Sequence, residues 1–147
     1  MFGSIVVGTD GSDTARKAVL EAVDLAKQLN ATVRIVSAFQ PVSNQRLRQE
    51  SRDAPADLEW TIHAREDVDA TLREAADSVE ASGVQVETFA REGDPADAIL
   101  DVAEEQGADL IVVGNKGMTG AKRFLLGSVP NKVSHHAPCS VLIVRTT

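Results

Sequence analysis

The chain of 147 residues has no tyrosine, one tryptophan, four phenylalanines and one cysteine, Cys139. A lone cysteine forms no internal disulfide, which excludes a small disulfide-stabilised scaffold. Aromatic residues are 3% of the chain, too few for the stacking platforms that bind single-stranded nucleic acid. No apolar run approaches the ~18 residues of a membrane span, and no signal peptide is evident. The sequence therefore predicts a cytoplasmic protein that binds neither membranes nor nucleic acid.

The residues that are present predict one globular domain. Hydrophobic residues make up 43% of the chain, and 147 residues is an ordinary length for a single domain. No internal repeat and no linker divides the sequence, so residues 1–147 are expected to form one domain.

Charge is distributed unevenly along this acidic chain, whose formal net charge is −7. The first 109 residues contain 10 basic and all 22 acidic residues, a net charge of −12, whereas the last 38 have a net charge of +5. An acid-free basic segment is a place to look for a local anion site. A short buried segment with little room for acidic side chains would produce the same asymmetry.

Short apolar runs alternate with segments of helical periodicity. The predicted strands are residues 5–7, 32–38, 84–90, 110–113 and 140–144. The predicted helices run from Ser12 to Asn30, over about 57–81, from Asp94 to Gly107 and over about 128–136, and 40–56 is predicted to be a mobile loop. Ser12 and Asp94 are expected to be N-caps, with Pro95 at the first helical position.

This alternation predicts an α/β fold with a doubly wound parallel sheet. Ligands bind such sheets beyond the carboxyl ends of the strands, where the strand order reverses. The first and fourth strands usually flank that point. In this chain they end at Gly8-Thr9-Asp10 and at Val113-Gly114.

A glycine-rich segment follows the fourth predicted strand. Gly114 and Gly117 form a Gly-x-x-Gly pattern, and after nine further residues Gly127 and Ser128 open a predicted helix. Glycines let a ligand approach the backbone closely, and a helix amino end offers free N–H groups, so the spacing predicts a polyphosphate cradle. Ser128 is expected either to cap the helix or to bind a phosphate oxygen. Positive charge is added by Lys116, Lys122 and Arg123.

The pattern differs from two commoner phosphate-binding sequences. A P-loop places Lys between its last Gly and its Ser or Thr, whereas Ser128 follows Gly127 directly. The dinucleotide fingerprint Gly-x-Gly-x-x-Gly belongs after the first strand, where only Gly8 and Gly11 stand. Binding of NAD is therefore disfavoured.

Together these segments resemble the universal stress protein family, of its ATP-binding type. The residues that carry the resemblance are 5–12, 91–96, 108–114, the glycine pattern of 114–128, and 137–144. The resemblance covers essentially the whole chain, and the loop 40–56 matches least. It implies a Rossmann-like, five-stranded parallel sheet in the order 3-2-1-4-5 and a homodimer paired along strand five, about 140–144.

The resemblance also implies ATP, expected together with Mg²⁺, as the bound ligand. Transferred by position, the adenine side would be held by Thr9, Asp10 and the backbone of Ala38. The ribose and phosphates would lie against Val113, Gly114, Gly117, Gly127, Ser128 and Val129. Asp10 has two interpretations, a contact to the nucleotide or its Mg²⁺, and a turn residue. Asn115-Lys116 departs from the frequent Ser/Thr-Arg or Ser-His pair, and a change in the ribose or phosphate contacts is expected there.

Three functions follow as hypotheses. The first is a dimeric, ATP-dependent regulator of stress tolerance, in which binding orders the loop 40–56 and the glycine segment and changes a surface read by an unknown protein partner. The second is an ATPase with at most weak hydrolysis, because Asp10 is the only acid near the expected site. The third is a nucleotide-free dimeric scaffold that covers the apolar edge of strand five.

Other catalytic chemistry is not expected. The loop 8–13 lacks the Ser-Gly-Gly-x-Asp-Ser pattern that an ATP pyrophosphatase needs. His135 and His136 with Cys139 match no strong zinc signature, so no metal is assigned to them. Cys139 precedes a buried strand and is interpreted as a small core residue.

Overall fold

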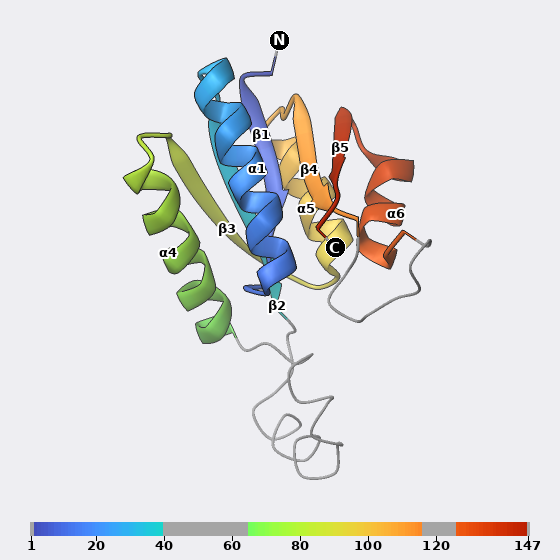
Figure 1. Ribbon diagram of the computed structural model, residues 1–147. Helices are drawn as coiled ribbons and strands as arrows, with labels where there is room; N and C mark the ends of the chain where they lie inside the picture. The colour runs from blue at the N-terminus through green and yellow to red at the C-terminus, as the bar shows by residue number, and fades with distance from the viewer. Residues whose placement is uncertain (1, 40–64, 116–125, 147) are drawn as a thin grey trace.

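The computed structural model describes residues 2–39, 65–115 and 126–146 of the chain. In these ranges five parallel strands form one sheet in the order β3-β2-β1-β4-β5, with helices on both faces (Figure 1). Along the chain the elements are β1 (Ser4–Gly8), α1 (Asp13–Leu29), β2 (Thr32–Phe39), α4 (Arg65–Ala81), β3 (Val86–Glu92), α5 (Pro95–Glu105), β4 (Leu110–Gly114), α6 (Ser128–His136) and β5 (Ser140–Val144). The predicted α/β domain with a doubly wound sheet in the order 3-2-1-4-5 is confirmed.

Side chains of the central strands alternate between two hydrophobic layers. Ile5 and Val7 of β1 pack beneath α1 and α4, whereas Val6 packs with α5 and α6 on the opposite face. Residues 5–7 and 110–113 are at most 5% exposed. Burial on both faces explains why these strands read as continuous apolar runs instead of alternating ones.

The edge strand β3 begins later than its sequence pattern predicts. The alternation predicts residues 84–90, but the strand runs from Val86 to Glu92 and pairs with β2 as far as Phe39. Val84 is buried because the chain passes through the core there, before the ladder begins, after a turn at Gly83 with φ +82°. The helix predicted over about 57–81 is seen from Arg65, and 57–64 and the loop 40–56 lie outside the described residues.

Local capping signals in the sequence identify the ends of α1 and α5. The Ser12 hydroxyl accepts from the N–H of Ala15 at 3.2 Å, and Asn30 ends α1 in the left-handed conformation with φ 54°. The Asp94 carboxylate accepts from the N–H of Asp97 at 3.1 Å, with Pro95 in the first turn. Both predicted N-caps are confirmed.

Removing the Ser12 cap is expected to destabilise the protein by about 1 kcal/mol, because Ser12→Ala leaves a helix N–H without its partner. Urea unfolding followed by circular dichroism measures the change. Ser12→Asp supplies a different capping oxygen and serves as the matched control, which should remain close to the unsubstituted protein. Equal losses in both variants would contradict a capping role.

Candidate functional site

The structure brings most of the predicted nucleotide-binding residues to one end of the sheet. The N–H of Thr9 donates to the carbonyl of Val36 at 2.9 Å, so the loop after β1 remains beside β2. The N–H of Gly127 donates to the carbonyl of Asn115 at 3.0 Å, which holds the start of α6 against the exit of β4. The predicted residues at this end are Thr9, Asp10, Ala38, Val113, Gly114, Gly127, Ser128 and Val129. Gly117 and the predicted cations Lys116, Lys122 and Arg123 lie outside the described residues.

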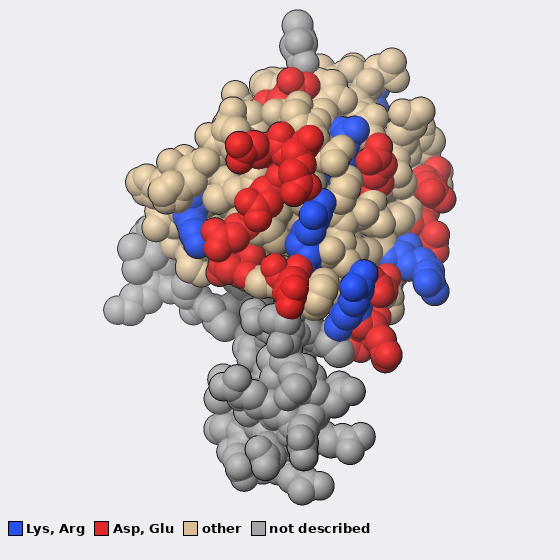
Figure 2. Space-filling view, turned by 180° about the vertical axis from the view of Figure 1, so that it is seen from behind, with Lys and Arg blue, Asp and Glu red and all other residues tan. Residues whose placement is uncertain are grey.

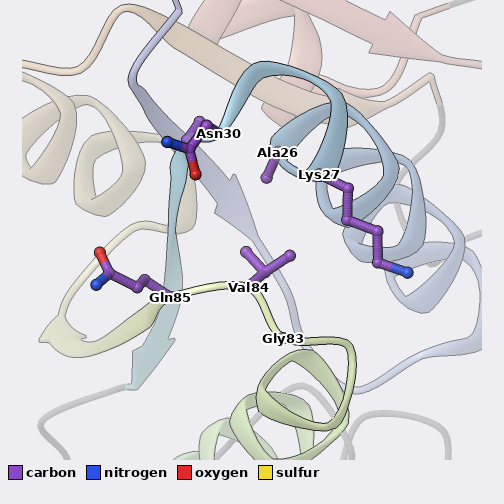
Figure 3. Close-up of a pocket in the computed structure, with 7 residues that line it drawn as sticks. Ala26, Lys27, Asn30, Gly83, Val84 and Gln85 are labelled. Atoms are coloured by element: carbon purple, nitrogen blue, oxygen red, sulfur yellow. The ribbon is translucent and has the colours of Figure 1, made fainter.

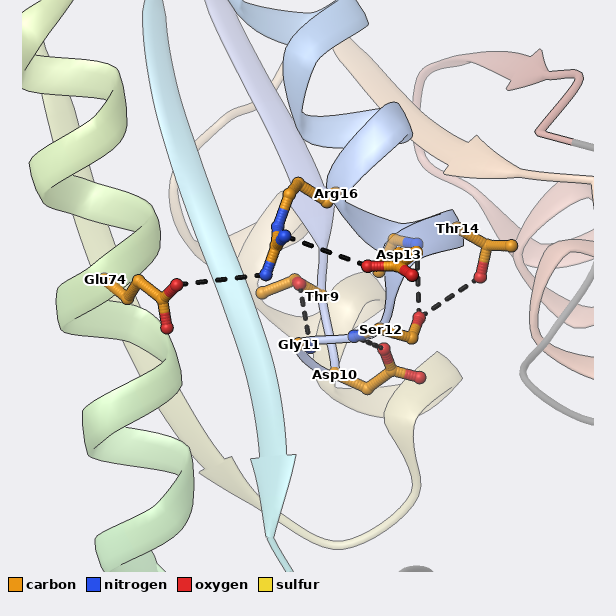
Figure 4. Close-up of polar contacts among 9 residues, drawn as sticks. Thr9, Asp10, Gly11, Ser12, Asp13, Thr14, Arg16 and Glu74 are labelled. Atoms are coloured by element: carbon orange, nitrogen blue, oxygen red, sulfur yellow. Dashed lines mark hydrogen bonds and ion pairs between the residues drawn. The ribbon is translucent and has the colours of Figure 1, made fainter.

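The loop after β1 is held by its own side chains (Figure 4). The Asp10 Oδ1 accepts from the N–H of Ser12 at 2.8 Å, and the Thr9 hydroxyl accepts from the N–H of Gly11 at 3.1 Å. Gly11 has φ +84°, and a Cβ there would lie 3.3 Å from the Thr71 side chain of α4. Asp10 is therefore a turn residue through Oδ1, and its contact to a nucleotide or Mg²⁺ stays a prediction.

Gly8 ends β1 at a point where α5 approaches the sheet. A Cβ at Gly8 would lie 2.5 Å from Cδ1 of Ile99 and 3.0 Å from its Cγ1. Ile99 is itself 4% exposed and has little room to move. The end of β1 at the candidate site thus has room only for glycine. This requirement is set by Ile99, 91 positions away, so it cannot be predicted from the residues around Gly8.

The amino end of α6 differs from those of α1, α4 and α5. Its N-cap is Gly127, which makes no side-chain cap hydrogen bond, and its first turn contains no acidic residue. The first turns of the other three helices contain Asp13, Glu66 and Asp67, and Asp97. The interpretation of Ser128 as a cap is wrong, because Gly127 is the cap and Ser128 is the first helical residue.

A helix start capped by glycine and without a side-chain cap hydrogen bond is suited to an anion. The first N–H groups of a helix have no partner within the helix and carry partial positive charge. Ser128 is exposed and Val129 half-buried, and Pro130 is buried behind them and has no N–H. The backbone of Ser128 and Val129 therefore supplies the donors that a phosphate would use.

Lys132 of α6 is engaged by α5 and not by the candidate site. Its ammonium lies 2.8 Å from a carboxylate oxygen of Asp97 and 3.5 Å from one of Asp94. The hydrogen bond to Asp97, together with the charge of Asp94, raises the pKa of Lys132. These contacts join α6 to the start of α5. They also engage Lys132, one of the basic residues of the acid-free segment, in ion pairs with the domain itself.

The surface behind the sheet is rich in carboxylates. Figure 2 shows Asp and Glu side chains gathered across this face, with Lys and Arg between them. The exposed acidic residues of α5 are Asp97, Asp101, Glu104 and Glu105. Negative charge on the body of the domain leaves the carboxylate-free start of α6 as a local exception.

Cys139 is a poor candidate for a nucleophile. Burial and the nearby carboxylate of Asp109 raise the pKa of the Cys139 thiol, which keeps it protonated at neutral pH and unsuited to nucleophilic attack. Among the described residues no group of three or more His, Cys, Asp or Glu side chains is arranged to hold a metal.

No helix within the described ranges is long and apolar enough to cross a membrane.

A separate pocket lies at the opposite end of the sheet. Figure 3 shows it between the end of α1 and the segment that enters β3. Its volume is about 470 Å³. Its lining residues are Ala26, Lys27, Asn30, Ala31, Gly83, Val84 and Gln85. None of the predicted site residues contributes to it, so this pocket is distinct from the candidate site.

Comparison with known proteins agrees with this architecture. The model of the universal stress protein family matches residues 1–145. The chain belongs to the universal stress protein family. It is 35% identical over 157 residues to universal stress protein YxiE of Bacillus subtilis, covering 99% of this chain and 100% of that protein. It is 37% identical over 147 residues to universal stress protein Rv1636 of Mycobacterium tuberculosis, covering 99% and 98%.

Solved universal stress proteins share the fold along its whole length. A universal stress protein in complex with cAMP superimposes with a TM-score of 0.73 at 35% identity, covering 99% of this chain and 98% of that one. Universal stress protein UspA from Lactobacillus plantarum superimposes with a TM-score of 0.76 at 27% identity, covering 98% of each chain.

In this universal stress protein, sequence reasoning missed the role of the residue after Gly114. Asn115 stands out in the sequence as a departure from the usual family pair, and ribose or phosphate contacts were expected to change there. In the structure its Oδ1 accepts from the N–H of Thr146 at 2.9 Å and from the Thr146 hydroxyl at 3.2 Å. The change in ribose or phosphate contacts stays a prediction. The unusual residue type at position 115 was visible in the sequence. Nothing in the sequence indicated that its partner would be Thr146, 31 positions away.

Proposed function

We propose that this universal stress protein binds ATP at the carboxyl end of its sheet and acts as a dimeric, nucleotide-dependent regulator of stress tolerance. The observation that carries the proposal is the amino end of α6, which has no side-chain cap and no carboxylate in its first turn. A polyphosphate would satisfy its free N–H groups and its partial positive charge.

The proposed ligand spans the loop after β1, the end of β2 and the start of α6. The adenine side lies against Thr9, Asp10 and Ala38, and the ribose and phosphates extend along Val113, Gly114, Gly117, Gly127, Ser128 and Val129. Asp10 uses Oδ1 for the N–H of Ser12, which leaves Oδ2 as the oxygen for a Mg²⁺ ion bound to phosphate. Mg²⁺ would neutralise phosphate charge there.

A cyclic nucleotide is the second candidate, because a 35% identical solved relative is in complex with cAMP. A cyclic phosphodiester has a single negative charge, so it draws less on the dipole of α6 than a triphosphate does. Competition between the two nucleotides therefore measures how much of the binding depends on the phosphate chain.

Two measurements test nucleotide binding. Mass spectrometry of freshly purified protein should detect a co-purified adenine nucleotide, and calorimetric titration with Mg-ATP should give about one site per chain. Parallel titrations with ADP and cAMP rank the phosphate requirement. Absence of heat with all three nucleotides, together with a nucleotide-free preparation, would favour the scaffold alternative.

Efficient ATP hydrolysis is not part of the proposal. Hydrolysis needs a group that orients water against the terminal phosphate. Asp10 is the only acid expected near the site, and its Oδ1 accepts from Ser12 while its Oδ2 is assigned to Mg²⁺. Phosphate release far above background that disappears in Asp10→Ala would instead establish the slow ATPase as an enzyme.

We also infer that the protein forms a homodimer through β5, with residues 1–147 acting as one cytoplasmic domain that is read by a protein partner. Within the described ranges β4 is the one strand that pairs with β5, and β5 exposes Leu142 by 37% and Ile143 by 39%. An apolar edge strand of this kind needs a cover, and a second copy of β5 supplies matching hydrogen bonds.

Ile143→Lys is expected to raise the dimer dissociation constant about tenfold, because a charge is placed at the proposed strand pairing. Light scattering across a dilution series measures the change. Ala70→Lys is the control, since Ala70 is exposed on α4, which packs against β2 and β3 at the opposite edge of the sheet. A wild-type monomer, or equal effects of the two variants, would contradict pairing through β5.

A further inference from the structure

Three parts of the chain meet at Asn115, the residue that follows β4. Its backbone N–H donates to the carbonyl of Val144 at 2.8 Å, and its own carbonyl accepts from the N–H of Gly127 at 3.0 Å. Val144 is the last residue of β5, and Gly127 is the N-cap of α6. The backbone of Asn115 therefore joins the ends of two strands to the start of the helix that carries the candidate anion site.

The side chain of Asn115 adds the C-terminal tail to this junction. Both the N–H and the hydroxyl of Thr146 donate to its Oδ1, at 2.9 and 3.2 Å. Thr146 is only 3% exposed although it lies beyond the last strand. Its carbonyl accepts from the Lys17 ammonium of α1 at 3.1 Å. The tail is thus held between α1 and the exit of β4.

These contacts make the amide of Asn115 difficult to replace. An amide oxygen has two lone pairs, and Thr146 uses both. Without that acceptor, the N–H and hydroxyl of the buried Thr146 would lose their hydrogen-bond partner. Leaving buried donors unsatisfied costs more free energy than losing the same hydrogen bonds at an exposed position. The tail would then be held less firmly, although Lys17 would still donate to the carbonyl of Thr146. Conversely, loss of the Thr146 donors would remove two hydrogen bonds from the side chain of Asn115.

We propose that Asn115 is a positioning residue for anion binding at α6 and that the C-terminal tail, through Thr146, is a working part of the site. The proposal rests on the proposed nucleotide-binding function. Gly127 determines the direction of the N–H groups of Ser128 and Val129, and Gly127 is itself held by the carbonyl of Asn115. When Thr146 holds the side chain, the backbone carbonyl keeps its orientation and the donors are preorganised for phosphate.

The proposed link between the docked tail and nucleotide binding must act in both directions. If the tail favours the binding-competent start of α6, then a bound nucleotide favours the docked tail by the same factor. Nucleotide should therefore slow hydrogen exchange at the N–H of Thr146, which donates to the side chain of Asn115 and not to the ligand. A purely structural role for this contact would leave that exchange rate unchanged on nucleotide binding.

Affinity measurements on a graded set of variants test whether the contact between Asn115 and Thr146 supports anion binding. Asn115→Ala is expected to weaken Mg-ATP binding about tenfold, Thr146→Val about threefold, and Thr146→Ser hardly at all, because serine keeps both donors. Val79→Ala is the matched control, since it removes a methyl pair from a core residue of α4 that is 1% exposed and far from α6. Wild-type affinity in Asn115→Ala, or an equal loss in Val79→Ala, would overturn the proposal.

Hydrogen exchange of the nucleotide-free protein separates this proposal from the proposed function. Asn115→Ala retains the backbone carbonyl that accepts from Gly127, so a direct loss is expected only at Thr146. Faster exchange at both Thr146 and Gly127 would show that the side chain sets the start of α6. Faster exchange at Thr146 alone would overturn the positioning role. If the wild-type protein binds no nucleotide, the proposed function fails, while this exchange result still decides whether Asn115 positions α6.

Discussion

Ser128→Asp is expected to weaken nucleotide binding about 100-fold while slightly stabilising the fold. Ser128 is the first residue of α6 and is exposed, so the new carboxylate lies beside the N–H groups of the first helical turn. A carboxylate in the first turn stabilises a helix by about 0.3–1 kcal/mol. The same carboxylate occupies the proposed phosphate donors and repels the phosphate charge, which is the reason for the opposite change in affinity.

Calorimetry with Mg-ATP and urea unfolding measure the two effects on the same preparation. Ser134→Asp is the matched control, because it adds the same charge to an exposed serine in the second half of α6. Ser128→Ala removes only the hydroxyl and should cost a few-fold in affinity. Equal loss of binding in Ser128→Asp and Ser134→Asp would refute a specific anion site at the amino end of the helix.

Gly8→Ala is expected to destabilise the protein by about 1–3 kcal/mol, because it overpacks the junction between β1 and α5. The added Cβ would lie 2.5 Å from Cδ1 of Ile99, whose side chain is 4% exposed. The sheet or α5 must shift to accept it. Urea denaturation at several temperatures reports the loss, and binding should weaken as well because Thr9 and Asp10 follow directly.

A second substitution tests this steric explanation. Ile99→Val removes the Cδ1 atom and by itself costs about 0.5–1.5 kcal/mol. In the double variant the closest contact no longer exists, so the combined loss should be smaller than the sum of the two single losses. Strict additivity would contradict the clash with Ile99 as the cause.

Much of the fold could be predicted from local pattern. Continuous apolar runs located β1 and β4 because both strands are buried on both faces. Ser12 and Asp94 were recognised as N-caps because capping depends on residues only three positions apart. The strand order was implied by the resemblance to the universal stress protein family, and the observed sheet topology confirms it.

Elements at the edge of the domain were predicted less accurately. The start of β3 was displaced by two residues, because Val84 is buried by the core before strand pairing begins. Alternation of side chains reports burial, and burial extends beyond the hydrogen-bonded ladder. Residues 40–64 and 116–125, which include Gly117 and the predicted mobile loop, lie outside the described parts of the chain.

The sequence by itself determined the α/β class, the acid-free final 38 residues and the end of the sheet where an anion site is expected. Only the tertiary structure shows that Gly127 and not Ser128 caps α6 and that Lys132 forms an ion pair with Asp97. It also shows that the side chain of Asn115 accepts a hydrogen bond from Thr146. The physical reason is separation along the chain. Asn115 and Thr146 are 31 positions apart, and they meet only because β5 docks beside β4 in one particular register.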